Sequence, residues 1–427
     1  MTGKTLLAGG CVLTLGSKVG NFAVADVLID DGVIVEVGTG LRARDAQVVD
    51  AVDTIVMPGF IDTHRHVSES LLRGLGDLPG PSVPTILHYS PEDVYAAALV
   101  GLLGAVEAGI TTVVDWCELP VGEHTEAALQ AHADSGLRTV LVSAAAPEWQ
   151  AGLRRLQGTT SNPLTGLAAG PADPAGDIDR ISADWSLARS LGLRIHSHIG
   201  TRRTDRGMAG VLASRNLLGD DVTLVHCSNL EDSDLDVVAS SGASVSLTPA
   251  SEMAGGSKPL QIQKLVDRGI RPGLGVDTAR AAPGDMFAQM RSAISLQHAT
   301  LFDLKLAGKA GLPRLLSTRE VIRYATVDGA RAIGLGSVTG ALEPGRQADI
   351  VVLRADRPNI WPINDPIGAV VWGMDTSNVD WVFVAGQPLM RNGVLDADLN
   401  RARTLATDAR RRVAAAAGLL APSGAAE

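Results

Sequence analysis

Short apolar runs alternate with helix-like segments along this chain, and this alternation restricts its fold more than any other feature. PEDVYAAALVGLLGAVEAG is one of the helix-like segments, and the runs are TTVVDW, RTVLVSA, GLRIHSH, VTLVHCS, ASVSLTP and RPGLGVD. Strands that are apolar on both faces are typical of parallel sheets covered by helices. Eight strand–helix units close a barrel of about 250 residues, and residues 59–340 suffice for them. The sequence therefore predicts an α/β fold with a (β/α)8 TIM barrel.

Both ends of the chain have strand character instead. Residues 1–58 contain several β-branched stretches, with a hairpin signal at Asp30-Asp31-Gly32. Strand patterns return in residues 341–396, so we expect the two ends to pair into one small composite β-sandwich domain beside the barrel. Residues 397–427 are rich in Ala and Arg and predict a C-terminal helix followed by a tail.

Several apolar runs end in residue types that bind metals. His64 and His66 are two positions apart in PGFIDTHRH, and side chains at i and i+2 of a strand share a face, so both imidazoles would point into the barrel. Three later runs supply His198, His226 and Asp277. The carboxyl ends of barrel strands meet at one rim, and imidazole and carboxylate are ligands of divalent metals. These positions predict a metal centre.

The motifs PGFIDTHRH, GLGVDT, GDMFAQMR and GALEPGRQADIVVL resemble the amidohydrolase superfamily, specifically its cytosine deaminase-like and triazine hydrolase-like branch. The resemblance covers nearly the whole chain. It implies that His64 and His66 are ligands from the first strand, with His198 from the fifth and Asp277 from the eighth. It gives His226, from the sixth strand, the role of binding the metal or of hydrogen-bonding its water and the substrate.

The resemblance also implies a divalent metal cofactor, and one ion is the simpler interpretation. Binuclear relatives commonly bridge their metals with a carboxylated lysine on the fourth strand, whereas this chain has no lysine between Lys18 and Lys258. A bridging carboxylate from Glu118 stays open. Zinc is the expected ion, and iron or manganese (Fe2+ or Mn2+) also suit these ligands. His196, deeper on the same strand face as His198, is expected to be a core or supporting residue.

One position departs from the pattern of the branch. Deaminating members usually carry a glutamate three residues after the fifth-strand histidine, where this chain has Thr201. A hydroxyl group cannot replace a carboxylate as the acid and base of the reaction near neutral pH. Proton transfer therefore falls to His226, Glu118 or Glu252. A purely structural role is the alternative for both glutamates.

Four residues are candidates for substrate binding: Thr201, Arg202, Trp116 and His88. Arg202 follows the fifth-strand ligand, and a guanidinium group can bind an anionic part of a substrate in a bidentate manner. Trp116 and His88 would line the pocket. A solvated loop is the alternative interpretation for Arg202, and packing is the alternative for the two aromatic rings.

Together these residues predict a metal-dependent hydrolase that acts on a non-peptide C–N bond of a cyclic amide, an amidine or an amino-substituted heterocycle. Metal-activated water would attack the carbon, Asp277 would accept a proton from it, and His226 would stabilise the developing charge. A lyase or decarboxylase on the same scaffold is the alternative, because Thr201 replaces the usual glutamate.

Composition limits the classes of partner that the protein can bind and the cellular compartment in which we expect it. A formal net charge of −10 argues against nucleic acid and anionic membranes, and no apolar run reaches the length of about 18 residues that a membrane span needs. The three cysteines include no CxxC pair, which favours a reducing cytoplasm. We expect a cytoplasmic enzyme with a small-molecule substrate, and the resemblance implies a homo-oligomer.

Overall fold

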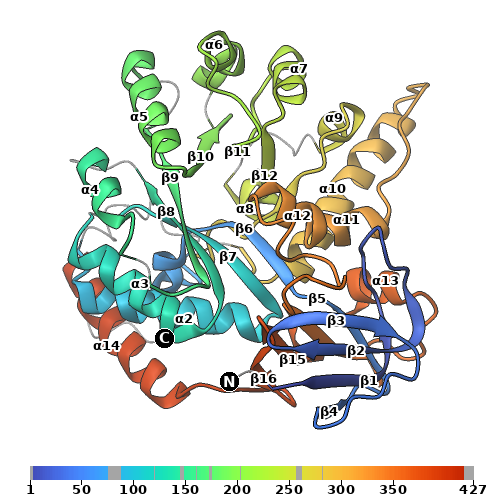
Figure 1. Cartoon of the computed structure of the whole chain (residues 1–427). Coiled ribbons are helices and arrows are strands. Elements are labelled where there is room, and N and C mark those ends of the chain that lie inside the picture. Colours follow the sequence, from blue (N-terminus) through green and yellow to red (C-terminus); the bar gives the residue numbers. More distant parts are fainter. Residues whose placement is uncertain are drawn as a thin grey trace, which may run out of the picture.

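The computed structural model describes residues 3–75, 88–119, 121–144, 149–159, 161–172, 176–201, 203–255, 262–280 and 282–417. These residues form an eight-stranded sheet surrounded by helices and a nine-stranded sheet built from both ends of the chain. Figure 1 shows the nine-stranded sheet at the lower right, below the helices that surround the first sheet. The predicted α/β class is confirmed.

The eight-stranded sheet follows chain order, and each strand pairs in parallel with the next. Its strands are β6 (Phe60–Arg65), β7 (Ile110–Cys117), β8 (Arg138–Ala144), β9 (Thr165–Gly170), β10 (Arg194–Ile199), β11 (Val222–His226), β12 (Ser244–Leu247) and β13 (Gly273–Leu274). A parallel sheet of this kind needs a crossover connection between neighbouring strands, usually a helix. The predicted TIM barrel is confirmed.

Helical segments make these connections and continue beyond β13. They are η1 (Val67–Leu72), α2 (Pro91–Glu107), α3 (Glu123–Ser135), α4 (Trp149–Leu156), α5 (Ile178–Ser190), η2 (Arg203–Asp205), α6 (Met208–Ser214), α7 (Asp232–Ser241), α8 (Pro249–Ala254), α9 (Ile262–Asp267), α10 (Met286–Leu306), α11 (Thr318–Tyr324) and α12 (Val327–Ala332). Several begin with a side-chain cap, for example Ser90 and Asp93 in a capping box at α2.

The barrel closes where the chain leaves β13 and runs beside β6. The amide of Asp277 donates to the carbonyl of His64 at 2.8 Å, and the amide of His66 donates to the carbonyl of Asp277 at 2.7 Å. Close approach requires glycine at position 275, because a Cβ atom there would lie 2.8 Å from the backbone nitrogen and oxygen of His64. Two predicted metal-binding segments, far apart in the sequence, are therefore hydrogen-bonded neighbours.

The nine-stranded sheet joins the two ends of the chain. Its strands are β1 (Thr5–Val12), β2 (Phe22–Asp30), β3 (Val33–Gly38), β4 (Gln47–Asp50), β5 (Thr54–Pro58), β14 (Ile350–Arg354), β15 (Val379–Val384), β16 (Gln387–Arg391) and β17 (Val394–Leu395). The central pair is antiparallel, with β5 against β14. Asp31 and Gly32 form the turn between β2 and β3 with φ of 50° and 81°, as a two-residue type I′ hairpin requires. The predicted composite β-domain is confirmed.

Three short helical segments connect β14 to β15: α13 (Pro366–Gly368), η3 (Ala369–Gly373) and η4 (Thr376–Asn378). The last helix, α14 (Leu399–Ala416), follows the nine-stranded sheet and lies against α2 (Figure 1). Arg412 holds α14 in place, because its Nη2 lies 2.6 Å from Oδ1 of Asp93 at the start of α2. None of the helices in the described part of the chain combines the length and apolar character that a membrane crossing requires.

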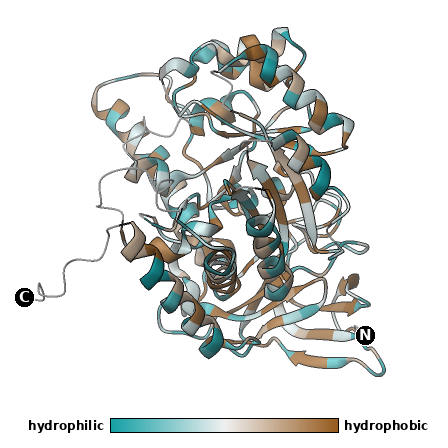
Figure 2. Cartoon of the chain, turned by 90° about the vertical axis from the view of Figure 1, so that its left-hand side faces the viewer, coloured by the Kyte–Doolittle hydropathy of each residue, from teal (hydrophilic) through white to brown (hydrophobic). Residues whose placement is uncertain are grey.

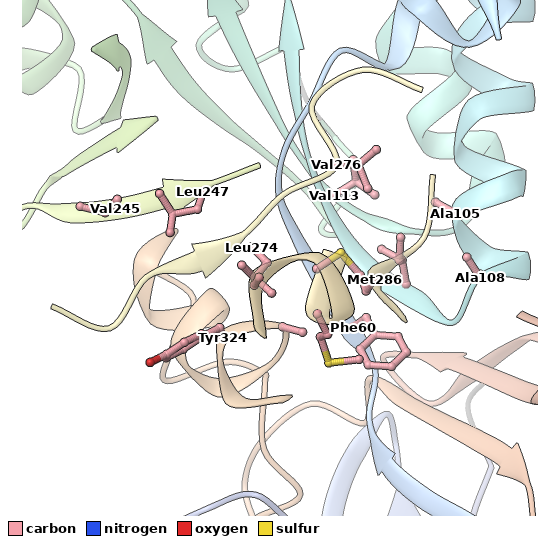
Figure 3. Packing of buried hydrophobic residues seen from close by; sticks show 14 of the residues in the cluster. Phe60, Ala105, Ala108, Val113, Val245, Leu247, Leu274, Val276, Met286 and Tyr324 are labelled. Atoms are coloured by element: carbon pink, nitrogen blue, oxygen red, sulfur yellow. The ribbon is translucent and has the colours of Figure 1, made fainter. Parts of the chain in front are cut away.

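Apolar side chains of strands and helices form the main core. Figure 3 shows part of it, where Phe60 and Met286 lie near Ala105 of α2 and near Ala108, the residue that follows this helix. The ring of Phe60 meets that of Phe287 edge to face with centroids 5.0 Å apart, a favourable aromatic geometry. The nine-stranded sheet encloses a separate core. In Figure 2 the strands are largely hydrophobic, whereas the helices also carry hydrophilic residues.

Two connections fix the barrel to the nine-stranded sheet. Strand β5 passes into β6 through Gly59 alone, where a Cβ atom would lie 2.1 Å from Cγ2 of Thr111. The second connection is a buried ion pair, in which Arg138 of β8 donates to both carboxylate oxygens of Asp349 at 2.8 and 3.1 Å. The first barrel strand is thus a direct continuation of the other sheet, and β8 is tied by an ion pair to the residue that precedes β14.

We expect Arg138→Met to lower the free energy of unfolding by about 3–5 kcal/mol, because it leaves the fully buried carboxylate of Asp349 without a countercharge. The control is Arg314→Met, which removes the partner of Glu320 in an exposed pair and should cost less than about 1 kcal/mol. Urea titration followed by circular dichroism measures both. Equal losses in the two variants would contradict the role given to the buried pair.

Candidate metal centre

Four imidazoles and one carboxylate meet at the carboxyl ends of the barrel strands. The Nε2 atoms of His64 and His198 are 3.1 Å apart. Oδ1 of Asp277 lies 3.5 Å from Nε2 of His64 and 3.3 Å from Nε2 of His66. His226 forms a further group with His64 and His198, in which the donor atoms lie within 4.8 Å of one another. The structure brings all five predicted metal-binding residues together.

Strand register and backbone conformation produce this convergence. His64 lies near the end of β6, and Ile199 at the end of β10 pairs with His226 at the end of β11. His226 and Asp277 have φ of 75° and 65°, in the left-handed region that residues other than glycine rarely adopt. Strained backbone of this kind is common at functional sites. Both residues occupy the positions where the chain turns away from the barrel.

Burial governs the protonation of the cluster. It lowers the pKa of His64 to about 4 and holds the pKa of His198 well below its ordinary value. Burial acts on His66 in the same direction, but the hydrogen bond and charge of Asp277 raise the pKa of His66 to about 10. Burial would raise the pKa of Asp277, yet hydrogen bonds from His64 and His66 hold it well below its ordinary value. Burial also acts to lower the pKa of His226, but the hydrogen bond with Glu252 and the charge of Asp277 raise it above its ordinary value. The cluster therefore combines a carboxylate with two neutral imidazoles, His64 and His198, and two rings that favour their protons, His66 and His226.

The donor set fits a divalent cation. Neutral imidazole nitrogens and a carboxylate oxygen are ligands that zinc and other first-row metals prefer. His64 is fully buried and His198 is partly buried, and their Nε2 atoms lie 3.1 Å apart. Without an ion this distance requires one ring to donate its proton to the other, whereas a divalent ion would bind the lone pairs of both rings.

Polar residues that follow β12 support the cluster. Oγ of Ser251 donates to Oδ2 of Asp277 at 2.6 Å, so Oδ1 is the oxygen that faces the imidazoles. Nδ1 of His226 lies 3.1 Å from Oγ1 of Thr248 and 3.3 Å from Oε1 of Glu252. Sequence reasoning proposed Glu252 but missed Ser251 and Thr248. Their position directly after the apolar run ASVSL was the signal that could have found them.

A second ion pair lies behind the cluster. Nε of Arg65 donates to Oδ2 of Asp62 at 2.6 Å, and Nη2 of Arg65 donates to the carbonyl of Gly284 at 2.7 Å. Oδ1 of Asp62 accepts from the amide of Val276 at 2.9 Å. Sequence reasoning gave Arg65 no definite role. In the structure it ties the strand that carries His64 to the segment that carries Asp277.

Glu118 and Trp116 border the cluster at the end of β7. Oε1 of Glu118 lies 4.0 Å from Nδ1 of His66, and 29% of its side chain is exposed. Its Oε2 is buried and has no hydrogen-bond partner among the described residues. The ring centroid of Trp116 lies 4.2 Å from that of His198. The glutamate thus reaches from the metal-binding residues towards solvent, and the tryptophan covers one side of them.

The remaining candidates are not part of the cluster. Thr201 is exposed, and its carbonyl accepts a hydrogen bond from Asn229 at 3.3 Å. His88 is also exposed, and no contact recorded among the described residues joins it to the cluster. Arg202 lies outside the described residues. His196 is fully buried, neither of its ring nitrogens has a partner in the described part of the chain, and burial holds its pKa well below its ordinary value.

Comparison with known proteins identifies relatives that match most of the length of this chain. The model of the amidohydrolase family matches residues 55–173 and 178–389. A 5′-deoxyadenosine deaminase of Methanothermobacter thermautotrophicus is 29% identical over 408 residues, which cover 88% of this chain and 92% of the relative. A 5-methylthioadenosine/S-adenosylhomocysteine deaminase of Pyrococcus furiosus is 28% identical over 399 residues, which cover 86% of this chain and 91% of the relative.

Solved structures share the fold. An adenosine deaminase from Xanthomonas campestris with bound zinc has a TM-score of 0.85 and 22% identity, covering 96% of this chain and 98% of that one. Atrazine chlorohydrolase from Arthrobacter aurescens, complexed with zinc, has a TM-score of 0.83 and 23% identity, covering 95% and 100%. At these identities the likeness shows the barrel and its companion sheet.

We expect His198→Ala to weaken metal binding by more than about 100-fold, beyond the effect of losing a supporting residue. The matched control is His196→Ala, which removes a buried imidazole from the same strand face but from outside the cluster. Metal content after gel filtration, measured by inductively coupled plasma mass spectrometry, compares the two variants with the parent chain. Full metal content in His198→Ala, or equal loss in both variants, would refute the assignment of His198 as a ligand.

Proposed function

Because the chain belongs to the amidohydrolase family, we propose that it is a deaminase that removes an amino group from a nitrogen heterocycle. The chain is a metal-dependent hydrolase of non-peptide C–N bonds with a small-molecule substrate. The non-hydrolytic alternative, a lyase or decarboxylase, is not favoured, since the relatives are deaminases. The convergence of His64, His66, His198 and Asp277 at the barrel rim is the observation that carries the proposal.

These four residues would hold one zinc ion, with His226 as a fifth ligand or as a contact to the substrate. Zinc is supported by the donor set and by the zinc named in two structures of the same fold. A divalent ion bound there lowers the pKa of its water to about 7, so that a nucleophile is available near neutral pH. A single ion is favoured because no lysine occurs between Lys18 and Lys258 to form a bridge.

Asp277 is the proton acceptor in this proposal. Its carboxylate is ionised, because its pKa is held below the ordinary value, and Ser251 orients it. It would therefore be available to take a proton from a water whose own pKa the metal has lowered, and to pass that proton on. His226 stabilises the charge that develops on the ring of the substrate. Its Nδ1 is held by Thr248 and Glu252, which leaves the other ring nitrogen for the metal or the substrate.

Glu118 is the residue we assign to protonation of the leaving amine. The hydroxyl of Thr201 is not acidic or basic enough for this step. Glu252 is buried, and its Oε1 accepts from the amide of Thr248 at 3.0 Å and lies 3.3 Å from Nδ1 of His226, so it positions His226 instead. Glu118 combines partial exposure with a buried oxygen that no described group satisfies, and it stands beside His66.

An amino-substituted purine is the substrate class that we propose. The relatives at 29% and 28% identity are named as deaminases of adenosine derivatives. Removal of an exocyclic amine from such a ring needs an activated water, a proton acceptor and a proton donor, which Asp277 and Glu118 complete. Assembly as a homo-oligomer and a cytoplasmic location stay predictions.

We expect metal-loaded protein to release ammonia from 5′-deoxyadenosine or a related adenosine derivative and to incorporate oxygen from 18O-labelled water into the product. Removal of the metal with a chelator should abolish turnover, and added zinc should restore it. Ammonia release and mass spectrometry of the product measure these outcomes. Turnover without label in the product would rule out hydrolysis, and metal-independent turnover would rule out the proposed centre.

Glu118→Gln should lower kcat for amino-substituted substrates by about 10²–10⁴-fold, because the leaving amine loses its proton donor. A substrate with a chloride leaving group needs no such proton, so its kcat should change much less. Glu123→Gln, an exposed charge change at the start of α3, is the matched control. If Glu118→Gln lowers kcat equally for the amino-substituted and the chloride-substituted substrate, the glutamate has a structural role and does not protonate the leaving amine.

A further inference from the structure

A groove of about 440 Å³ lies between η1, α2 and α14, outside the metal centre. Its charged lining residues are Arg73 after η1, Glu107 at the end of α2, and Arg403 and Arg410 on α14. The groove thus contains one carboxylate and three guanidinium groups, which gives it an excess of positive charge. This local excess of positive charge stands in a chain whose formal net charge is −10, so general surface composition does not explain it.

Helix α14 carries five arginines, and three of them have partners within the chain. The guanidinium carbon of Arg401 lies 5.6 Å from the ring centroid of Tyr95. The other two form ion pairs, Arg411 with Asp408 at 3.0 Å and Arg412 with Asp93 at 2.6 Å. No ion pair is recorded for Arg403 or Arg410 among the described residues. The two arginines without such a partner are the two that line the groove.

Arg403 and Arg410 are seven residues apart on α14, which is close to two helical turns, so both project on the same side of the helix. Arg73, which follows η1, lines the same groove from another element. A Cβ atom at Gly104 of α2 would lie 3.1 Å from its Nη2, so the absence of a side chain at this position makes room for the guanidinium group. The three charges therefore line one space from two parts of the chain.

Apart from the hydroxyl groups of Ser70 and Thr407, the rest of the lining is apolar. Leu71, Val100, Leu103, Leu395 and Leu399 contribute to it, and a groove of this size accommodates a small molecule. Guanidinium groups bind phosphate oxygens in a bidentate manner, and two or three of them together favour a doubly charged group over a single carboxylate. A hydrophobic body attached to that group would cover the leucines and valine.

We propose that this groove is a second ligand site, which binds a phosphate monoester carried on a small apolar body. The site is physically connected to the metal centre, because η1 begins directly after His66 and carries Leu71 into the groove. Ser70 of η1 packs against α2, where a Cβ atom at Gly101 would lie 2.3 Å from its Oγ. A ligand in the groove would therefore contact the segment that immediately follows two proposed metal ligands.

Isothermal titration calorimetry of the metal-loaded full chain with phenyl phosphate tests the site. We expect one phenyl phosphate per chain, weaker binding of inorganic phosphate, and no measurable binding of phenol. Arg403→Gln combined with Arg410→Gln should weaken the binding of phenyl phosphate by roughly 100-fold, which is about tenfold for each charge-assisted contact that is lost. The matched control is Arg411→Gln, one residue away, whose charge is already paired with Asp408; it should bind within twofold of the parent chain.

Metal content and the thermal unfolding midpoint of the variants should match the parent chain, because both replaced arginines are exposed. Phenyl phosphate that binds the double variant as tightly as the parent would show that the anion binds outside this groove, for example at the metal centre, and it would overturn the proposal. Absence of phenyl phosphate binding to the parent, or equal loss in Arg411→Gln, would overturn it as well.

Discussion

Backbone hydrogen bonds between Asp277 and β6 are the interaction on which the rest of the site depends. They join the first barrel strand to the segment after the last one, with N···O distances of 2.8 and 2.7 Å, and so they bring a carboxylate and two imidazoles together. Gly275 permits the approach, and the pair of Asp62 and Arg65 secures it. The metal-binding geometry is therefore a result of closing the barrel.

Much of this arrangement could be predicted from the sequence because parallel strands impose their own geometry. The spacing of His64 and His66 and the position of His198, His226 and Asp277 after apolar runs are enough to place them at one rim. The supporting residues were harder to find. The apolar run ASVSL places Ser251 at the same rim, but the sequence does not show which group its hydroxyl contacts until Asp277 is placed beside it.

The same limit applies to residues that act through distant partners. The pairing of Arg138 with Asp349, and the groove between η1 and α14, join positions separated by more than two hundred residues. No periodic pattern reports such contacts, because they depend on how complete elements pack. Thr201 differs, because the sequence alone marked its position as unusual. In the structure its side chain is exposed, and Glu118 is the carboxylate that lies beside the metal-binding residues.

The antiparallel pairing of β5 with β14 also has a consequence for how the polypeptide is made. Pro58 pairs with Ile350, so strands at the beginning of the chain must wait until nearly three hundred more residues have left the ribosome before their sheet can be completed. Domains generally form as units during synthesis, and here the barrel emerges between the two halves of its companion. The early strands therefore spend most of translation with an unpaired edge, which can pair with another strand until β14 is made.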